Sequence, residues 1–165
     1  MEEEARRDVD AARPDVDAAR RETVRYHEEL YGRARLGTTG SWLARPHRRV
    51  VEALALVDGP VHAYDLGCGI GRHTLLLAAE LPTGSRVTAV DLLPSAVARV
   101  AEQAEDSGLG DRVEVVAADL EDYRFPASDA GLLVAVSVVE QLPSAEAVAE
   151  LLDRCRRATR PGGVH

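Results

Sequence analysis

Four short, almost unbroken apolar runs follow one another along this chain, with helical patterns between them. The runs cover residues 61–66, 87–91, 113–117 and 132–139. Their residues do not alternate between apolar and polar, which is typical of parallel strands that are buried on both faces. Helical patterns lie over residues 70–81, 94–107 and 144–158. This alternation predicts an α/β fold built on a doubly wound, mostly parallel sheet.

The chain divides by composition into a charged leader, residues 1–36, and a domain, residues 37–165. The leader repeats the sequence DVDAAR at an offset of seven residues, which would suit a coiled coil. Pro14 interrupts that pattern, so the alternative is a solvated segment that becomes helical from about Pro14 and caps the domain. The run GTTG at 37–40 is expected to be a loop.

Length and composition indicate one soluble domain. The chain has 165 residues, of which 45% are hydrophobic, and it contains neither an apolar run of membrane-spanning length nor a signal-peptide pattern at its start. The two cysteines, Cys68 and Cys155, form no metal-binding pair. We therefore expect a cytoplasmic protein with reduced thiols, no metal site and no membrane partner.

The charge excludes several classes of function. A formal net charge of −8 argues against nucleic acid as a partner, because phosphate contacts dominate that affinity. All 20 basic residues are arginine, so the chain has neither the phosphate-binding lysine of P-loop NTPases nor a Schiff-base lysine for pyridoxal phosphate. A small-molecule substrate is the better expectation.

A glycine-rich loop directly follows the first predicted strand. It reads Asp65-Leu-Gly67-Cys-Gly69-Ile-Gly71, and the second strand ends in an acid, Asp91. Glycines let the backbone approach a ligand closely, and an acid at the end of the second strand can accept both hydroxyls of a ribose. The spacing G-x-G-x-G differs from the G-x-G-x-x-G of dinucleotide folds, so a ligand that contains a nucleoside but is not the dinucleotide NAD is favoured.

This loop resembles the first motif of the class I S-adenosylmethionine-dependent methyltransferases, and the resemblance covers roughly residues 60–163. It implies a Rossmann-like methyltransferase fold with S-adenosylmethionine as cofactor. It further implies that Asp91 holds the ribose, that Asp119 and Leu120 line the adenine pocket, and that the loop surrounds the amino-acid end. The residues it assigns to the cofactor site are Arg45, Asp65, Gly67, Cys68, Gly69, Gly71, Asp91, Leu92, Asp119, Leu120 and Ala135.

Arg45 belongs to this set because the segment 43–54 is similar to the lead-in helix of the tellurite-resistance type. A guanidinium can bind the cofactor carboxylate with two hydrogen bonds. The alternative is a solvated arginine in front of a helix. An Asn-Pro-Pro-Tyr type signature is absent at the end of the fourth strand, where Ala135 and Val136 stand instead, so methylation of nucleic-acid bases is disfavoured.

The resemblance implies in-line methyl transfer to a small-molecule acceptor, for which a general base is optional because positioning alone can lower the barrier by about 7–11 kcal/mol. Tyr26 and Tyr31 are candidates to close over the site, and His47 or Glu140 to take a proton from a hydroxyl acceptor. A purely structural role is the alternative for each of them.

Other functions stay open at this level. They are a nicotinamide-dependent oxidoreductase, a non-catalytic cofactor-binding protein and, more remotely, an aminopropyl transferase. The family's fifth strand begins after a turn like Arg160-Pro-Gly-Gly163, and this chain ends at His165. We therefore expect the sheet to stop before strand five, leaving the apolar fourth strand as an open edge that a further segment or a second copy would cover.

Overall fold

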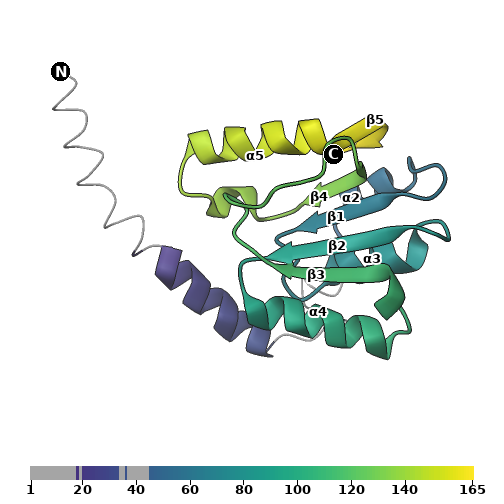
Figure 1. The fold of residues 1–165 in the computed structure, drawn as a ribbon. Helices are drawn as coiled ribbons and strands as arrows, with labels where there is room; N and C mark the ends of the chain where they lie inside the picture. The colour runs from purple at the N-terminus through teal and green to yellow at the C-terminus, as the bar shows by residue number, and fades with distance from the viewer. Residues whose placement is uncertain (1–17, 19, 34–35, 37–44) are drawn as a thin grey trace, which may run out of the picture.

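The structure, a computed structural model, describes residues 18, 20–33, 36 and 45–165 (Figure 1). A helix over residues 20–33 comes first. The elements that follow are α2 (Arg48–Leu54), β1 (His62–Leu66), α3 (Arg72–Glu80), β2 (Arg86–Asp91), α4 (Pro94–Asp106), the 3-10 turn Gly110–Arg112, β3 (Val113–Ala117), β4 (Ala130–Ala135), the 3-10 turn Val139–Gln141, α5 (Ala145–Ala158) and β5 (Thr159–Val164).

The strands form one parallel sheet in the order β3-β2-β1-β4-β5. The strand β1 lies in the middle and pairs with both β2 and β4, so the chain reverses its direction of travel across the sheet at this point. In sheets of this kind, ligands bind outside the carboxyl ends of the strands where the order reverses. The predicted Rossmann-like α/β fold is confirmed, and it directs attention to the loops after β1, β2 and β4.

Helices cover both faces of the sheet because successive strand residues point to opposite sides. On one face, Ala63 of β1 and Leu132 of β4 pack against Leu77 of α3 and Val50 of α2. On the other, the core includes Tyr64, Leu66 and Leu133 from the strands and Leu151, Cys155 and Ala158 from α5. In Figure 1, α5 accordingly lies beside β4 and β5, away from α3 and α4.

Most predicted elements are confirmed to within two residues, but the fourth strand is not. We expected it over 132–139, whereas β4 starts at Ala130 and ends at Ala135. The backbone leaves the extended region soon afterwards, because Ser137 has a φ of 57° and a 3-10 turn begins at Val139. The apolar residues after 135 were therefore wrongly assigned to the strand. They lie at the carboxyl edge of the sheet instead.

The expectation that the sheet stops before strand five is wrong. Residues Thr159–Val164 form β5, which pairs in parallel with β4 through Ala130↔Thr159 and Leu132↔Val164. Between these pairs β5 has three residues more than β4. The extra residues include Gly162, whose backbone has a φ of 77°. The Pro-Gly-Gly sequence that we interpreted as a turn is thus an irregularity within the strand. The open edge at β4, our reason for expecting a covering partner there, does not exist.

The crossover from β3 to β4 contains no α-helix, and a polar and aromatic cluster lies on the sheet face beside it. Asp129 accepts a hydrogen bond from the Tyr64 hydroxyl, at 2.6 Å, and pairs with the ring of His62. The other ring nitrogen of His62 lies 2.7 Å from the Thr88 hydroxyl. Phe125 packs edge-on against Tyr64, with ring centroids 5.3 Å apart. Burial and the hydrogen bond to Asp129 raise the pKa of Tyr64.

Some predictions lie outside the described residues. The DVDAAR repeat and the GTTG loop fall almost entirely on residues 1–17, 19, 34–35 and 37–44, so the division into a leader at 1–36 and a domain at 37–165 stays a prediction. Among the helices that are described, none is long and apolar enough to cross a membrane. Within the same residues, no group of His, Cys, Asp or Glu side chains is arranged to hold a metal ion.

Candidate functional site

The glycine loop after β1 is held tightly at the carboxyl edge of the sheet. The backbone N–H groups of Gly67 and Cys68 both donate to the carbonyl oxygen of Val90, at 2.8 and 3.0 Å. Gly67 and Gly69 have φ values of 67° and 53°, in the left-handed region that favours glycine. A Cβ on Gly67 would collide with the Val138 side chain, so the loop after β4 lies directly against this glycine.

Asp91 joins the glycine loop to the end of β2. Its Oδ2 accepts a hydrogen bond from the N–H of Gly69 at 2.8 Å, and its Oδ1 accepts one from the N–H of Leu93 at 3.0 Å. A carboxylate offers about four lone-pair positions, so two backbone donors leave room for two more. Asp91 is therefore fixed in orientation and still able to accept hydrogen bonds from a ligand.

The segment after β3 supplies the other acid. Asp119 accepts a hydrogen bond from the N–H of Glu121 at 3.0 Å through Oδ1, and its Oδ2 pairs with the guanidinium of Arg20. The next residue, Leu120, is almost fully buried and packs with the α5 side of the core. Arg154 of α5 donates to the carbonyl oxygen of Leu120 at 2.5 Å and so ties this segment to the sheet's second layer.

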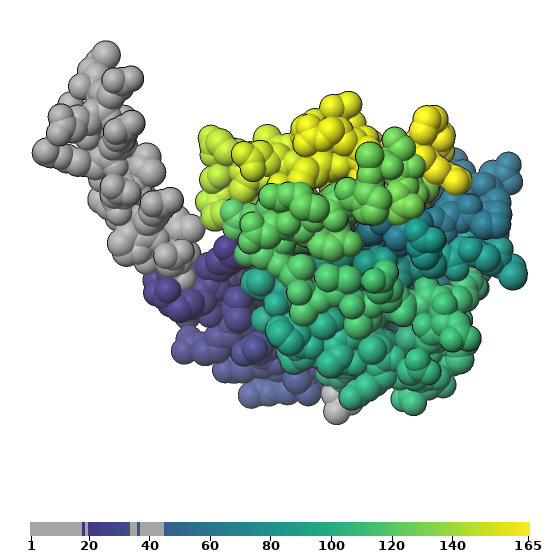
Figure 2. All heavy atoms as spheres, in the orientation of Figure 1, coloured from purple at the N-terminus to yellow at the C-terminus, as the bar shows by residue number. Residues whose placement is uncertain are grey.

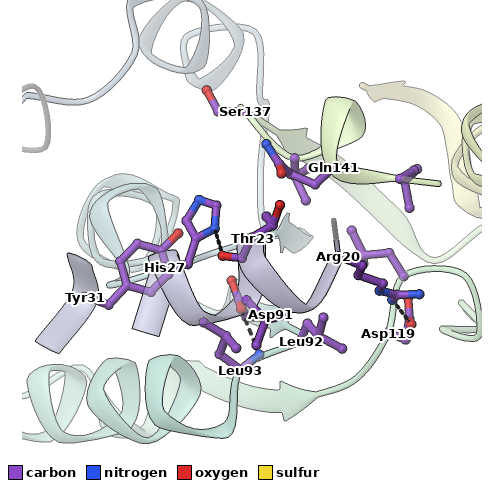
Figure 3. A pocket seen from close by; sticks show the side chains of 15 residues that line it. Arg20, Thr23, His27, Tyr31, Asp91, Leu92, Leu93, Asp119, Ser137 and Gln141 are labelled. Carbon is purple, nitrogen blue, oxygen red and sulfur yellow. Dashed lines mark hydrogen bonds and ion pairs between the residues drawn. The ribbon is translucent and has the colours of Figure 1, made fainter. Parts of the chain in front are cut away.

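The N-terminal helix 20–33 lies across these loops and forms the roof of the site. Figure 2 shows it packed against the main body of the molecule, and Figure 3 shows its side chains facing Asp91 and the loop after β4. Arg20 contacts Asp119 at one end, and Tyr31 lies over Gly69 at the other. Burial and the nearby Asp91 raise the pKa of Tyr31, so its hydroxyl keeps its proton at neutral pH.

Two adjoining cavities lie between this helix and the sheet. The first, of about 110 Å³, is lined by Arg20, Thr23, Val24, His27, Tyr31, Gly67, Asp91, Leu92, Leu93, Asp119, Leu120, Ser137, Val138, Gln141 and Leu142. The second, of about 350 Å³, shares several of these and adds Tyr26, Leu30, Cys68, Gly69, Ile70, Arg72, His73, Val136 and Glu140. The first opens on the Asp91 and Asp119 side and the second on the glycine loop.

The structure thus brings together most of the residues that the sequence assigned to the site. Those that line a cavity are Gly67, Cys68, Gly69, Asp91, Leu92, Asp119, Leu120, Tyr26, Tyr31 and Glu140. Those that line neither cavity are Arg45, His47, Asp65, Gly71 and Ala135. Ala135 is the exposed last residue of β4, and Gly71 precedes α3, with Val100 packed against it.

Asp65 lies beneath the loop and faces α3. It is 1% exposed, and its Oδ2 accepts a hydrogen bond from the Thr74 hydroxyl at 2.6 Å. Burial raises the pKa of Asp65 to about 6, and the hydrogen bonds from Thr74 only partly oppose that shift. From this position Asp65 supports the loop from below and has no direct access to a ligand in either cavity.

His47 has a local structural role. Its Nδ1 accepts a hydrogen bond from the N–H of Arg49, which caps the start of α2, and its own N–H donates to Nε2 of His73 at 3.1 Å. Burial, together with the positive charge of Arg72, lowers the pKa of His73 to about 4, so this ring is a neutral acceptor at pH 7. The idea of His47 as a proton acceptor at the site receives no support from this geometry.

Several lining residues were missed from the sequence. Arg20, Thr23 and His27 share one face of the helix 20–33 with Tyr31, which the sequence did suggest, at spacings of three and four residues, and that periodicity was the signal available. Arg72, the first residue of α3, lies on the wall of the larger cavity, and its NH1 donates to the carbonyl oxygen of Arg45 at 3.3 Å. Of Arg45 and Arg72, only Arg72 lines this cavity, together with Cys68 and Gly69 of the glycine loop.

Comparison with known proteins decides the family. A family model described as a methyltransferase domain matches residues 63–163. The chain belongs to the class I S-adenosylmethionine-dependent methyltransferases. The cofactor of this family is S-adenosylmethionine, which sets aside the nicotinamide alternative.

Three relatives illustrate the range of this methyltransferase family. Over 106 residues the chain is 38% identical to a carboxy-S-adenosyl-L-methionine synthase of Chromohalobacter salexigens, and this alignment covers 62% of this chain and 37% of the relative. It is 34% identical over 101 residues to a trans-aconitate 2-methyltransferase of Streptomyces avermitilis, covering 61% and 37%. The chain thus spans little more than a third of each of these curated relatives.

The third is a solved structure. A methyltransferase from Geobacter sulfurreducens, in complex with S-adenosylhomocysteine, superposes with a TM-score of 0.57 at 24% identity, over 73% of this chain and 47% of that one. At that identity the likeness shows the shared fold.

Proposed function

We propose that this chain binds S-adenosylmethionine in the groove between helix 20–33 and the loops after β1, β2 and β3, and transfers its methyl group to a small-molecule acceptor. The observation that carries the proposal is the position of Asp91. Its carboxylate is oriented by the N–H groups of Gly69 and Leu93, and it lines the smaller cavity with lone pairs to spare.

The residues present suit each part of the cofactor. The ribose hydroxyls would be held by Asp91, and the base would lie between Leu92 and Leu120, with its amino group near Asp119. The amino-acid end would lie on the glycine loop, where Arg72 can bind a carboxylate with its guanidinium. Bound there, the cofactor would supply an electrophilic methyl group that needs no activation by the protein.

The larger cavity is the proposed place for the acceptor. Its walls combine the exposed aromatic ring of Tyr26 with polar groups from Ser137, Glu140 and Gln141. Of the proton acceptors weighed from the sequence, Glu140 lines this cavity and His47 does not. The task of these walls is to exclude water and to hold the attacking atom in line, which accounts for a large share of rate enhancement in such reactions.

Two titrations and one assay test the proposal. Calorimetric titration with S-adenosylhomocysteine is expected to give saturable binding, whereas NADH is expected to give none. Incubation with radiolabelled S-adenosylmethionine and a panel of small carboxylates, amines and phenols is then expected to transfer label to one class. Failure to bind S-adenosylhomocysteine would contradict the proposal. Binding without any turnover across the panel would favour the non-catalytic, cofactor-binding alternative.

A further inference from the structure

We infer that Arg154 of α5 is a positioning residue for recognition of the purine base, and that it acts on the Asp119 carboxylate through the peptide unit between Leu120 and Glu121. The inference rests on the proposed function, because Asp119 is the acid proposed to lie near the amino group of that base. Arg154 itself lines neither cavity. Its guanidinium instead donates a hydrogen bond of 2.5 Å to the carbonyl oxygen of Leu120.

Arg154 lies on the inner face of α5, although it is charged. Residues three positions apart are neighbours on one helix face. Three positions before Arg154 is Leu151, which is buried in the core together with Leu120. Arg156 differs, because its side chain is 68% exposed and pairs with Asp153 of the same helix. Of these two arginines, only Arg154 is directed at the segment after β3.

The guanidinium of Arg154 is held there at a cost to folding. Its Nε is buried and finds no hydrogen-bond partner within the part of the chain that the structure describes. A buried donor without an acceptor lowers the free energy of unfolding. Departures of this kind from full hydrogen bonding are typical of functional sites. The burial of Arg154 therefore points to a role beyond holding α5 to the sheet.

One peptide unit connects Arg154 to Asp119. The carbonyl of Leu120 and the N–H of Glu121 belong to the same planar group and point in opposite directions. Arg154 binds the carbonyl oxygen, and the N–H donates to Oδ1 of Asp119 at 3.0 Å. Fixing the carbonyl therefore fixes the direction of the N–H that orients the carboxylate. A charged donor on the carbonyl also polarises the peptide and strengthens the hydrogen bond made by its N–H.

The Asp119 carboxylate can still bind a ligand. It has about four lone-pair positions. The N–H of Glu121 takes one at Oδ1 and the guanidinium of Arg20 takes one at Oδ2, and the carboxylate lines the smaller cavity beside Leu120. The remaining lone pairs can accept a hydrogen bond from an exocyclic amino group, but not from a purine that has a hydrogen atom in its place. The preference for the amino group therefore depends on how firmly Asp119 is oriented.

Arg154→Met, compared with Arg156→Met, is the direct test. Methionine keeps an unbranched apolar side chain on the helix and removes the hydrogen-bond donors. Arg156→Met removes the same charge from the same helix without touching the segment after β3. Calorimetric titration of the full chain gives one Kd for S-adenosylhomocysteine and one for its analogue with hydrogen in place of the purine amino group. The ratio of the two Kd values measures recognition of the amino group.

We expect the wild type and Arg156→Met to share one ratio in favour of S-adenosylhomocysteine. In Arg154→Met the preference is expected to fall by up to about ten-fold, the equivalent of one hydrogen bond of ordinary strength. Affinity for the analogue is expected to stay unchanged. Circular dichroism checks that each variant is folded. Arg154→Gln, which keeps an uncharged donor, takes the place of an unfolded Arg154→Met, with a smaller fall expected in the same ratio.

Each contrary result has its own meaning. If Arg154→Met weakens the binding of both ligands equally, or of neither, the ratio is unchanged and Arg154 only supports the fold, which overturns the inference. If the wild type binds both ligands equally well, the inference is also overturned, while the proposed cofactor site stands. If the wild type does not bind S-adenosylhomocysteine, the proposed function fails and this inference fails with it.

Discussion

The Asp91 carboxylate and the backbone N–H of Gly69 are joined by a hydrogen bond of 2.8 Å that ties the end of β2 to the loop after β1. The bond links the two features that matter most at this edge of the sheet. The glycine loop is kept in a left-handed conformation, and the acid is kept pointing along the groove. Changes at either residue are therefore expected to affect the other.

Gly69→Ala tests the glycine side of this link. An alanine at this position would have to adopt the left-handed backbone conformation, at a cost of about 1–2 kcal/mol. Its Cβ would also lie 2.9 Å from the Tyr31 hydroxyl oxygen. Gly108→Ala is the matched control, because Gly108 has a φ of 68° and a Cβ added to it would meet nothing within 4 Å. Urea unfolding is expected to show a similar loss in both variants, with weaker S-adenosylhomocysteine binding only in Gly69→Ala. Equal binding by the two would contradict the close approach assigned to Gly69.

Asp65→Asn tests the buried acid. The folded pKa of Asp65, about 6, lies above its ordinary 3.8, so the folded state holds the proton more tightly than the unfolded chain does. The contribution of Asp65 to the free energy of unfolding is therefore largest below about pH 4. It decreases as the pH rises through about 6, by up to about 3 kcal/mol in total. Measured as the unfolding free energy of Asp65→Asn minus that of the wild type, the difference should grow between pH 4 and pH 7.5. A difference that does not change with pH would refute the raised pKa.

Arg72→Ala and Arg45→Ala separate two candidates for the cofactor carboxylate. Arg72 lines the larger cavity beside the glycine loop, whereas Arg45 is exposed and lines neither cavity. We expect Arg72→Ala to lower the affinity for S-adenosylhomocysteine about ten-fold or more, in line with the loss of a charged hydrogen bond. Affinity for 5′-methylthioadenosine, which lacks the carboxylate, is expected to stay unchanged, and calorimetry measures both. The opposite pattern, with Arg45→Ala the weaker binder, would restore the interpretation made from the sequence.

Much of the fold and half of the site follow from local sequence. The strands β1, β2 and β3 are predictable because buried parallel strands have short apolar runs, and the carboxyl ends of such strands necessarily meet at one edge. That rule alone brings Gly67, Asp91 and Asp119 together. The strand β5 was missed because the glycines that usually end an element serve here as an irregularity within it.

The position of helix 20–33 over the site could not be predicted in the same way. The contact between Arg20 and Asp119 joins residues 99 positions apart, and no local periodicity encodes which surface an amphipathic helix will cover. The place of Arg72 on the cavity wall could not be predicted for a similar reason. Its NH1 donates to the carbonyl oxygen of Arg45, so the two residues are neighbours, but of the two only Arg72 lines the larger cavity.

The central claim, that Asp91 holds the ribose of S-adenosylmethionine, is tested most directly by calorimetric titration of S-adenosylhomocysteine into the wild type and Asp91→Ala. Removing a buried carboxylate that accepts hydrogen bonds from a ligand is expected to cost about 1.5–3 kcal/mol, or roughly ten-fold to a hundred-fold in affinity. Circular dichroism checks that the variant is folded. A folded Asp91→Ala variant that binds S-adenosylhomocysteine as tightly as the wild type would contradict the claim.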